Sequence, residues 1–157
     1  MATSTANASA SEKVKIRRAR RGDAERLAQL SGELGYPATA NQIATRLRLL
    51  KPASKHAVFV AESSDAPAGL VGWLHASVSH LLESDIRAEV NGLIVAEGQR
   101  SAGAGAKLLE AAEEWARRRG CRGMNVRSNV VRARAHGFYE RNGYEHYKTQ
   151  KAFRKAL

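Results

Sequence analysis

Residues 91–105, with the sequence NGLIVAEGQRSAGAG, join a strand-like run to the start of an amphipathic helix. Leu93–Val95 is typical of a buried strand. Asn91–Gly92, just before it, predicts a β-bulge or a close approach by another part of the chain, because glycine weakens a regular strand. The loop Arg100–Gly105 sets two glycines ahead of a helix whose apolar stripe starts at Leu108. Such a loop either exposes helix N-terminal amides to a phosphate or simply makes a tight turn.

Two familiar phosphate-binding loops are excluded at this place. A Walker loop needs Lys-Ser or Lys-Thr after its last glycine, and neither pair follows Gly105. The dinucleotide-binding fingerprint needs a third glycine, which is missing here.

The segments after the loop alternate between helical and strand patterns. A helix is predicted over Ala102–Arg119, because apolar residues recur on one face and Gly120 is a typical stop. Its stripe consists of Leu108, Leu109, Ala112, Trp115 and Ala116. Beyond it we expect a strand, a shorter helix and two short strands, at Cys121–Arg127, Val131–Arg141, Tyr144–Tyr147 and Thr149–Phe153.

The segments before the loop predict a strand, two helices and a hairpin. Asp23 is placed as the N-cap of the first helix, and Thr39 with Gln42 forms a capping box at the start of the second. The strands are expected at Val14–Ile16, Ala57–Ala61, Leu70–Val78 and Glu89–Val95. The order βααβββαβαββ indicates an α/β fold: a mixed, mostly antiparallel sheet of about six to seven strands, with helices on both faces.

Length and composition favour one soluble domain over residues 12–157, preceded by a disordered tail over residues 1–11 that is rich in Ala, Ser and Thr. Cys121 is the single cysteine, so an internal disulfide and a cysteine-based metal site are excluded. We expect a cytoplasmic protein without a metal or a membrane partner, because neither a secretory signal nor a long apolar run occurs in the sequence.

The positive charge is concentrated in one part of the chain. The net charge is +11, and from Trp115 to Leu157 twelve Lys and Arg face two acids, Glu140 and Glu145. A polyanion, a phosphate-rich cofactor or mere solubility would each account for it. Nucleic-acid binding beyond a non-specific level is not expected, because no aromatic stacking series or known reader motif accompanies the arginines.

Two separated motifs resemble the GNAT (GCN5-related) N-acetyltransferase superfamily. Arg-x-x-Gly-x-Gly at Arg100–Gly105, after a Leu-Ile-Val strand, is similar to its cofactor motif. Ala135–Tyr144, AHGFYERNGY, is similar to its downstream Ala-x-x-Phe-Tyr-x-x-x-Gly-Tyr signature. The expected element order fits this family over residues 13–157. The resemblance implies a V-shaped splay after the fourth strand and an acetyl-CoA (coenzyme A) site.

The resemblance also implies roles for individual residues. The fourth strand offers its backbone to pantetheine, chiefly at Leu93 and Val95, and the loop amides hold the pyrophosphate. The implied cofactor-binding set is Leu93, Ile94, Val95, Arg100, Ser101, Ala102, Gly103, Ala104, Gly105 and Ala106. Tyr139 matches the tyrosine that protonates the departing thiolate, although a core aromatic beside Phe138 is the alternative interpretation.

The proton acceptor and one cofactor contact are less clearly marked. Glu89 lies eleven residues before Arg100, as does the glutamate base of histone-modifying relatives, but it could also be a solvated edge charge. His75 is the second candidate base, whereas His56 is interpreted as a surface or capping residue. Where relatives carry a pantetheine-binding Asn, this chain has Arg132, and either Arg132 or Asn129 takes that role.

These features favour an acetyl-CoA-dependent N-acetyltransferase acting on a primary amine by direct attack in a ternary complex. A basic nucleic-acid-binding module and a catalytically inactive acetyl-CoA sensor are the alternatives. Tyr36, Trp73 and His75 are expected at the amine site, with Glu33, Glu83 and Asp85 suited to a cationic small molecule or peptide. The identity of the amine and the formation of a homodimer stay open.

Overall fold

The computed structural model describes residues 13–50, 55–67, 69–100 and 102–157. The expected tail at residues 1–11 lies outside this part of the chain. Close packing divides the chain into two compact units, one ending at Val126 and the other running from Arg127 to Leu157. Each is described by itself.

The first unit is built around a sheet in which the strands follow one another in chain order, β1-β2-β3-β4-β5. The first four strands pair antiparallel, and β5 joins β4 in parallel. The strands are β1 Val14–Arg18, β2 His56–Ser63, β3 Leu70–Leu81, β4 Ser84–Val95 and β5 Met124–Val126. The helices are α2 Ala24–Glu33, α3 Ala40–Leu49 and α4 Ala104–Arg118, with short 3₁₀ turns η1 Arg21–Asp23 and η2 Glu97–Gln99.

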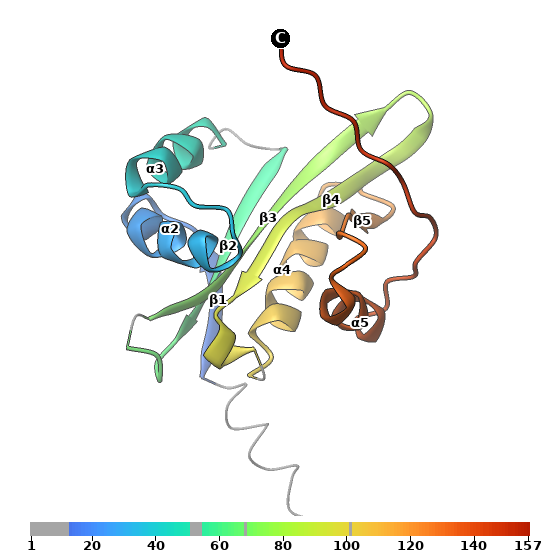
Figure 1. The fold of residues 1–157 in the computed structure, drawn as a ribbon. Helices are drawn as coiled ribbons and strands as arrows, with labels where there is room; N and C mark the ends of the chain where they lie inside the picture. The colour runs from blue at the N-terminus through green and yellow to red at the C-terminus, as the bar shows by residue number, and fades with distance from the viewer. Residues whose placement is uncertain (1–12, 51–54, 68, 101) are drawn as a thin grey trace, which may run out of the picture. The chain divides into compact units, whose positions relative to one another are not determined.

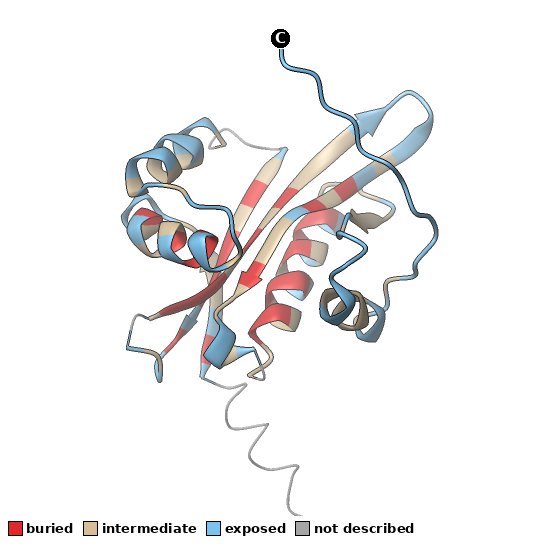
Figure 2. Ribbon diagram, in the orientation of Figure 1, coloured by how far each residue is buried: buried red, intermediate tan, exposed pale blue. Residues whose placement is uncertain are grey.

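Helices cover both faces of this sheet, as the sequence predicted (Figure 1). Leu108 of α4 packs against β3 at Gly72, where an added Cβ would lie 3.3 Å from its Cδ1 atom. On the opposite face, Leu27 of α2 and Ile43 of α3 gather with Val60, Leu70 and Trp73. The predicted α4 stripe is buried along its length (Figure 2). Burial of these side chains is the main favourable contribution to folding here.

An irregularity in the β3–β4 pairing confirms the bulge predicted at Asn91–Gly92. His75 is opposite Gly92, whereas the next residue, Ala76, is opposite Val90, so Asn91 is the extra residue on β4. Glycine is needed beside it, because a Cβ on Gly92 would lie 2.9 Å from two ring carbons of Trp73. The bulge and the indole ring therefore form one packed unit.

The helix starts in the first half of the chain are only partly as predicted. The capping box of α3 is confirmed, with the Gln42 amide donating to Thr39 Oγ1 and the Thr39 amide donating to Gln42 Oε1. Asp23 is the N-cap of α2 but makes no side-chain cap there. Its carboxylate instead accepts from the Arg20 amide at 2.7 Å and from both terminal nitrogens of Arg17.

The second unit contains α5 Ala133–Arg141, which stops at Gly143 in a left-handed conformation with φ of 86°. The strands predicted at Tyr144–Tyr147 and Thr149–Phe153 are wrong, because these residues form no strand in the structure. From Glu145 to Leu157 every side chain is exposed, Tyr147 and Phe153 included, so no buried apolar face holds these residues in a sheet. The regular sheet has five strands rather than six or seven.

Three further element boundaries differ from expectation. The helix α4 starts at Ala104 and not at Ala102, because the left-handed Gly103 precedes it as N-cap. The strand β5 is shorter than the predicted Cys121–Arg127, and α5 starts after Arg132. In the part of the chain that the structure describes, no helix has the length and apolar character of a membrane span.

We predict that Gly92→Ala destabilises the protein by about 1–3 kcal/mol, because its Cβ would overlap the Trp73 ring and overpacking costs about that much. Urea denaturation measures the change. Gly98→Ala is the matched control, since nothing lies within 4 Å of a Cβ at that position. A Gly92→Ala protein as stable as the control would show that the ring is free to move away.

Candidate functional site

Among the described residues, no strand pairs with the edge of β4 facing away from β3 beyond Val90. The parallel ladder with β5 covers only Ala88–Val90, opposite Met124–Val126. The Ala96 amide donates to Val71 on β3, and backbone groups alternate along an antiparallel strand. The amides and carbonyls of Leu93 and Val95 therefore point to the open edge, whereas those of Ile94 point toward β3. This is the splay that the resemblance implied.

The loop after β4 is held by its own hydrogen bonds. Arg100 Nε donates to the carbonyl of Val95 at 3.2 Å, and the Ala102 amide donates to the carbonyl of Gln99 at 3.3 Å. The side chain of Arg100 thus already contacts the strand end, and the Ala102 amide is already engaged. Ser101, also expected to contact a cofactor, lies outside the described residues.

The start of α4 exposes backbone donors. Gly103 has φ of 76°, a conformation that few other residues adopt without strain. The amides of Ala104, Gly105 and Ala106 belong to the first helical turn, and among the described residues no backbone carbonyl accepts from them. A helix N-terminus whose first amides have no carbonyl acceptor among the described residues, and which has no acid in its first turn, favours an anion.

Polar side chains line the face of β2, β3 and β4 that lies toward α2 and α3. Ser77 is the register partner of both His56 and Glu89, so these three side chains form one row across the sheet. Asn91, the bulged residue, donates from Nδ2 to Ser77 Oγ at 2.8 Å. Glu89 is half-buried at the end of this row.

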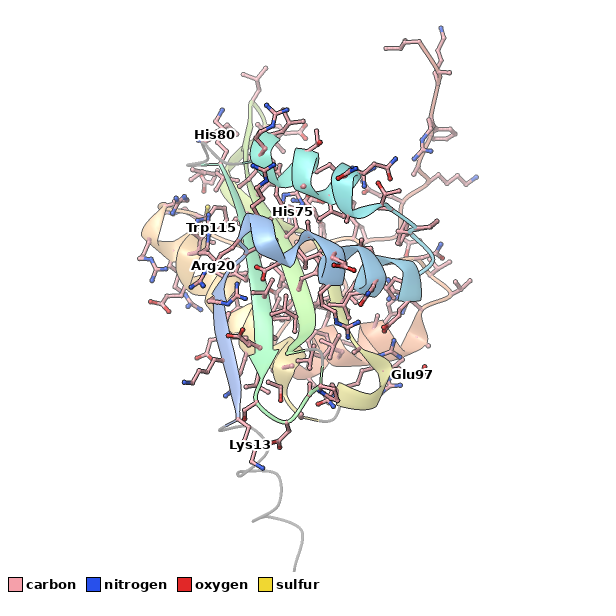
Figure 3. All side chains as sticks on the ribbon, turned by 90° about the vertical axis from the view of Figure 1, so that its left-hand side faces the viewer. Lys13, Arg20, His75, His80, Glu97 and Trp115 are labelled. Carbon is pink, nitrogen blue, oxygen red and sulfur yellow. The ribbon has the colours of Figure 1, made fainter. Side chains whose placement is uncertain are left out.

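The two histidines of this face contact each other directly. His56 Nδ1 and His75 Nε2 are 3.1 Å apart, and both rings are half-buried. Burial lowers the pKa of His75 to about 4, and repulsion by a charge on His56 adds to the effect. His75 is therefore neutral near pH 7. Figure 3 views the sheet from the α2 and α3 side, with His75 labelled.

The other residues expected at the amine site lie on different elements of the first unit. Trp73 neighbours His75 on β3, and its buried Nε1 has no hydrogen-bond partner in the described part of the chain. Tyr36 is 70% exposed on the connection between α2 and α3. Trp73 and His75 share one face with Gly92, because the pairing places them beside the bulge.

The second unit carries Tyr139, the predicted proton donor, and Asn129 and Arg132, the two candidates for the pantetheine contact. Tyr139 is half-buried on α5 and packs edge-on against Phe138 and Tyr144. Burial raises the pKa of Tyr139, and the positive charge of Arg132 partly opposes this, so the hydroxyl stays protonated at neutral pH. Asn129 Oδ1 accepts from the Val131 amide, and Arg132 is an exposed N-cap.

A comparison with protein families identifies the chain. Residues 24–144 match the profile of the Acetyltransferase (GNAT) family. The chain belongs to the GNAT acetyltransferase family. The match spans both predicted motifs, the loop at Arg100–Gly105 and the AHGFYERNGY segment, and confirms the resemblance found in the sequence.

Solved structures of GNAT and related acetyltransferases share this fold. The aminoglycoside N-acetyltransferase AAC(6')-Iy in complex with CoA is 19% identical, with a TM-score of 0.80 over 92% of this chain and 95% of that one. Glucosamine-6-phosphate N-acetyltransferase from Arabidopsis thaliana is 17% identical, with a TM-score of 0.77 over 90% and 97%. A transcriptional regulator from Bacillus halodurans is 23% identical, with a TM-score of 0.76 over 89% and 99%. No curated protein matches by sequence.

Further features of this GNAT chain concern its free cysteine and the grouping of possible metal ligands. Burial raises the pKa of Cys121, so its thiol is a poor source of thiolate at neutral pH. Within the described residues no cluster of three or more His, Cys, Asp or Glu could hold a metal ion. The sequence analysis did not place His56 and Ser77 at the site. Only the register of the predicted hairpin strands could have shown that these residues lie beside His75 and Glu89.

We predict that His75 makes stability depend on pH between about pH 4 and its unfolded value of about 6.5. Its folded pKa is the lower one, so the unfolded chain binds the proton first and stability falls as pH drops through this window. Urea denaturation of wild type and His75→Gln at several pH values measures the difference. His80→Gln, at an exposed position of the same strand, is the control. Identical pH profiles for His75→Gln and wild type would contradict the burial of His75.

Proposed function

We propose that this protein is an acetyl-CoA-dependent N-acetyltransferase that modifies a primary amine. The observation that supports it best is the arrangement of one continuous segment. The Asn91 bulge leaves the backbone of Leu93 and Val95 on an open strand edge, and the left-handed Gly103 follows at the start of α4. An extended amide-bearing arm and a pyrophosphate are the ligand groups that such a strand edge and helix start would bind together.

The residues present fit coenzyme A. The amides of Leu93 and Val95 would pair with the pantetheine arm, while those of Gly103–Ala106 would hold the pyrophosphate. The hydrogen bond that Arg100 donates to the Val95 carbonyl supports this loop, and its guanidinium adds positive charge. Arg132 and Asn129 of the second unit are proposed as further cofactor contacts. When bound, acetyl-CoA supplies an acetyl group activated as a thioester.

The chain must supply an acceptor for the proton of an ammonium substrate, because only the neutral amine attacks a thioester carbonyl. Glu89 and His75 lie on the same face of β4 and β3, beside the bulge, and are the two candidates. Tyr139, kept protonated by burial, is proposed to donate a proton to the departing thiolate. The order of reaction that we propose is direct transfer in a ternary complex.

A cationic small molecule is the substrate class that we propose. Two of the similar structures are named as acetyltransferases of aminoglycosides and of glucosamine-6-phosphate, whose acceptors are amines. In this chain Trp73 and Tyr36 offer aromatic surface on the α2 and α3 side of the sheet, and Glu33, Glu83 and Asp85 offer exposed carboxylates. An assay of thiol release with a broad amine panel tests the proposal.

We predict that acetyl-CoA raises the thermal midpoint of the wild-type protein and that Gly103→Val abolishes this shift. The ligand stabilises the folded state that it binds, and a side chain at Gly103 would block the amides of the first helical turn. Gly120→Val is the matched control. It imposes the same strain at φ of 76°, about 1–2 kcal/mol, at the opposite end of α4. A normal ligand-induced shift in Gly103→Val would contradict the loop assignment.

We predict that Tyr139→Phe lowers kcat by about 10²-fold or more while the Kd of acetyl-CoA changes little, because only the proton donor is removed. Steady-state kinetics and calorimetric titration give the two quantities. Tyr147→Phe, at an exposed position of the same unit, serves as the control. If turnover of Tyr139→Phe stays within twofold of wild type, the ring packing against Phe138 and Tyr144 is the residue's whole role.

A further inference from the structure

The contact between His56 and His75 is unusual because it joins two imidazoles directly, with no carboxylate hydrogen-bonded to either ring within the described residues. The nitrogens His56 Nδ1 and His75 Nε2 lie 3.1 Å apart, and their rings are tilted by 31°. At this separation one nitrogen donates and the other accepts, so at least one ring is neutral. An imidazole can accept a proton at one nitrogen while it releases another from the second.

The two histidines extend across the sheet from beside the β4 bulge toward β2, away from the strand edge proposed for the cofactor. His75 is the register partner of Gly92, the residue that follows the bulge, and its ring lies on the same face as Trp73. His56 lies one strand further from β4, on β2. In the described part of the chain no residue hydrogen-bonds His75 Nδ1, the ring nitrogen that does not face His56.

Resting on the proposed function, we infer that His75 and His56 form a proton relay that accepts the proton of the substrate ammonium and delivers it to solvent. His75 is the group that contacts the substrate, and His56 acts through it. Of the two candidate proton acceptors beside the bulge, His75 is then the one that takes the proton. The role of Glu89 is to attract the cationic substrate.

The proton balance of the relay is complete without a further reactant. The ammonium proton enters at His75 Nδ1, the proton on His75 Nε2 passes to His56 Nδ1, and His56 Nε2 releases a proton to water. The neutral amine then forms the C–N bond as the C–S bond breaks, and its second proton ends on the thiol. Overall, R–NH₃⁺ and the thioester give the amide, the free thiol and one proton in solution.

Burial explains why a relay suits this place better than a single base. A lone His75 with its pKa held near 4 would retain a proton poorly, whereas immediate transfer to His56 avoids a charged His75. The charged side chains on the elements next to the pair are Arg46 and Arg48 on α3, Lys55 before β2, and Arg87 and Glu89 on β4. Arg18 donates to the His56 backbone carbonyl at 3.5 Å, but its guanidinium lies over the Phe59 ring, on the face of the sheet opposite the two histidine rings.

The test uses variants that keep the hydrogen bond but cannot transfer a proton onward. The amide of His56→Asn can occupy the position of Nδ1, and that of His75→Gln the position of Nε2. At pH 7 we expect kcat to fall about tenfold for His56→Asn and about 10²-fold for His75→Gln, with the KM for acetyl-CoA unchanged. The rates of both variants should rise about tenfold per pH unit below the amine pKa, because free amine must then come from solution. Wild type should show a flatter profile.

Controls separate the relay from a structural role. His80→Gln should leave kcat and its pH profile unaltered, and added imidazole should restore part of the activity of His56→Ala. Glu89→Gln should raise the KM for the amine and keep the wild-type pH profile. Nitrogen-15 NMR of the histidine rings in the free protein should show His75 neutral down to about pH 4.

Each opposing outcome has a distinct meaning. If wild type releases thiol but His56→Asn matches its rate and pH profile, or if Glu89→Gln alone removes the dependence on an internal base, the relay is overturned and the proposed function stands. If His56→Asn loses activity with an unchanged pH profile and no rescue by imidazole, the pair is only structural. If wild type neither binds acetyl-CoA nor releases thiol with any amine, the proposed function fails, and the relay with it.

Discussion

The extra residue in β4 is the constraint on which the arrangement of this sheet depends. Up to Val90 the strand is held between β3 and β5, with the Ala88 amide donating to Gly123 on the β5 side. Beyond Asn91 the alternation of the backbone is shifted by one residue, so Leu93 and Val95 turn their polar groups to an edge that β5 no longer covers. A regular strand would have presented Ile94 there instead. The bulge therefore creates a row of backbone donors and acceptors without any change of fold.

Glycine positions show how the surrounding packing adapts to the bulge. Gly92 leaves room for the Trp73 ring, and Gly72 leaves room for the Ile94 carbonyl, 2.6 Å from where a Cβ would lie. Gly92 thus makes room for packing on the α2 and α3 side of the sheet, and Gly72 makes room for packing on the opposite face. A Cβ at either position would overlap backbone or ring atoms, so both glycines are required for the close packing on the two faces.

Local signals explain what the sequence could predict. The α4 stripe, the capping box at Thr39 and the stop at Gly120 each depend on residues a few positions apart, and each was correctly placed. The β3–β4 bulge was one of the two alternatives that Asn91–Gly92 predicted. The contact of His56 with His75 depends instead on the register of two strands, which spacing along the chain does not reveal. The two strands predicted at the C-terminus do not form, for a related reason. Tyr147 and Phe153 have strand-forming side chains, but no apolar surface covers them.

The hydrogen bond from Arg100 to the Val95 carbonyl ties the far end of the loop back to the strand it leaves. The bond restricts the conformations open to the backbone between Val95 and Arg100. Binding to such a loop costs less ordering entropy than binding to a loose one, and affinity gained in this way needs no additional contact with the ligand. The Arg100 guanidinium would then have two roles: it supplies positive charge, and it preorganises the loop for binding.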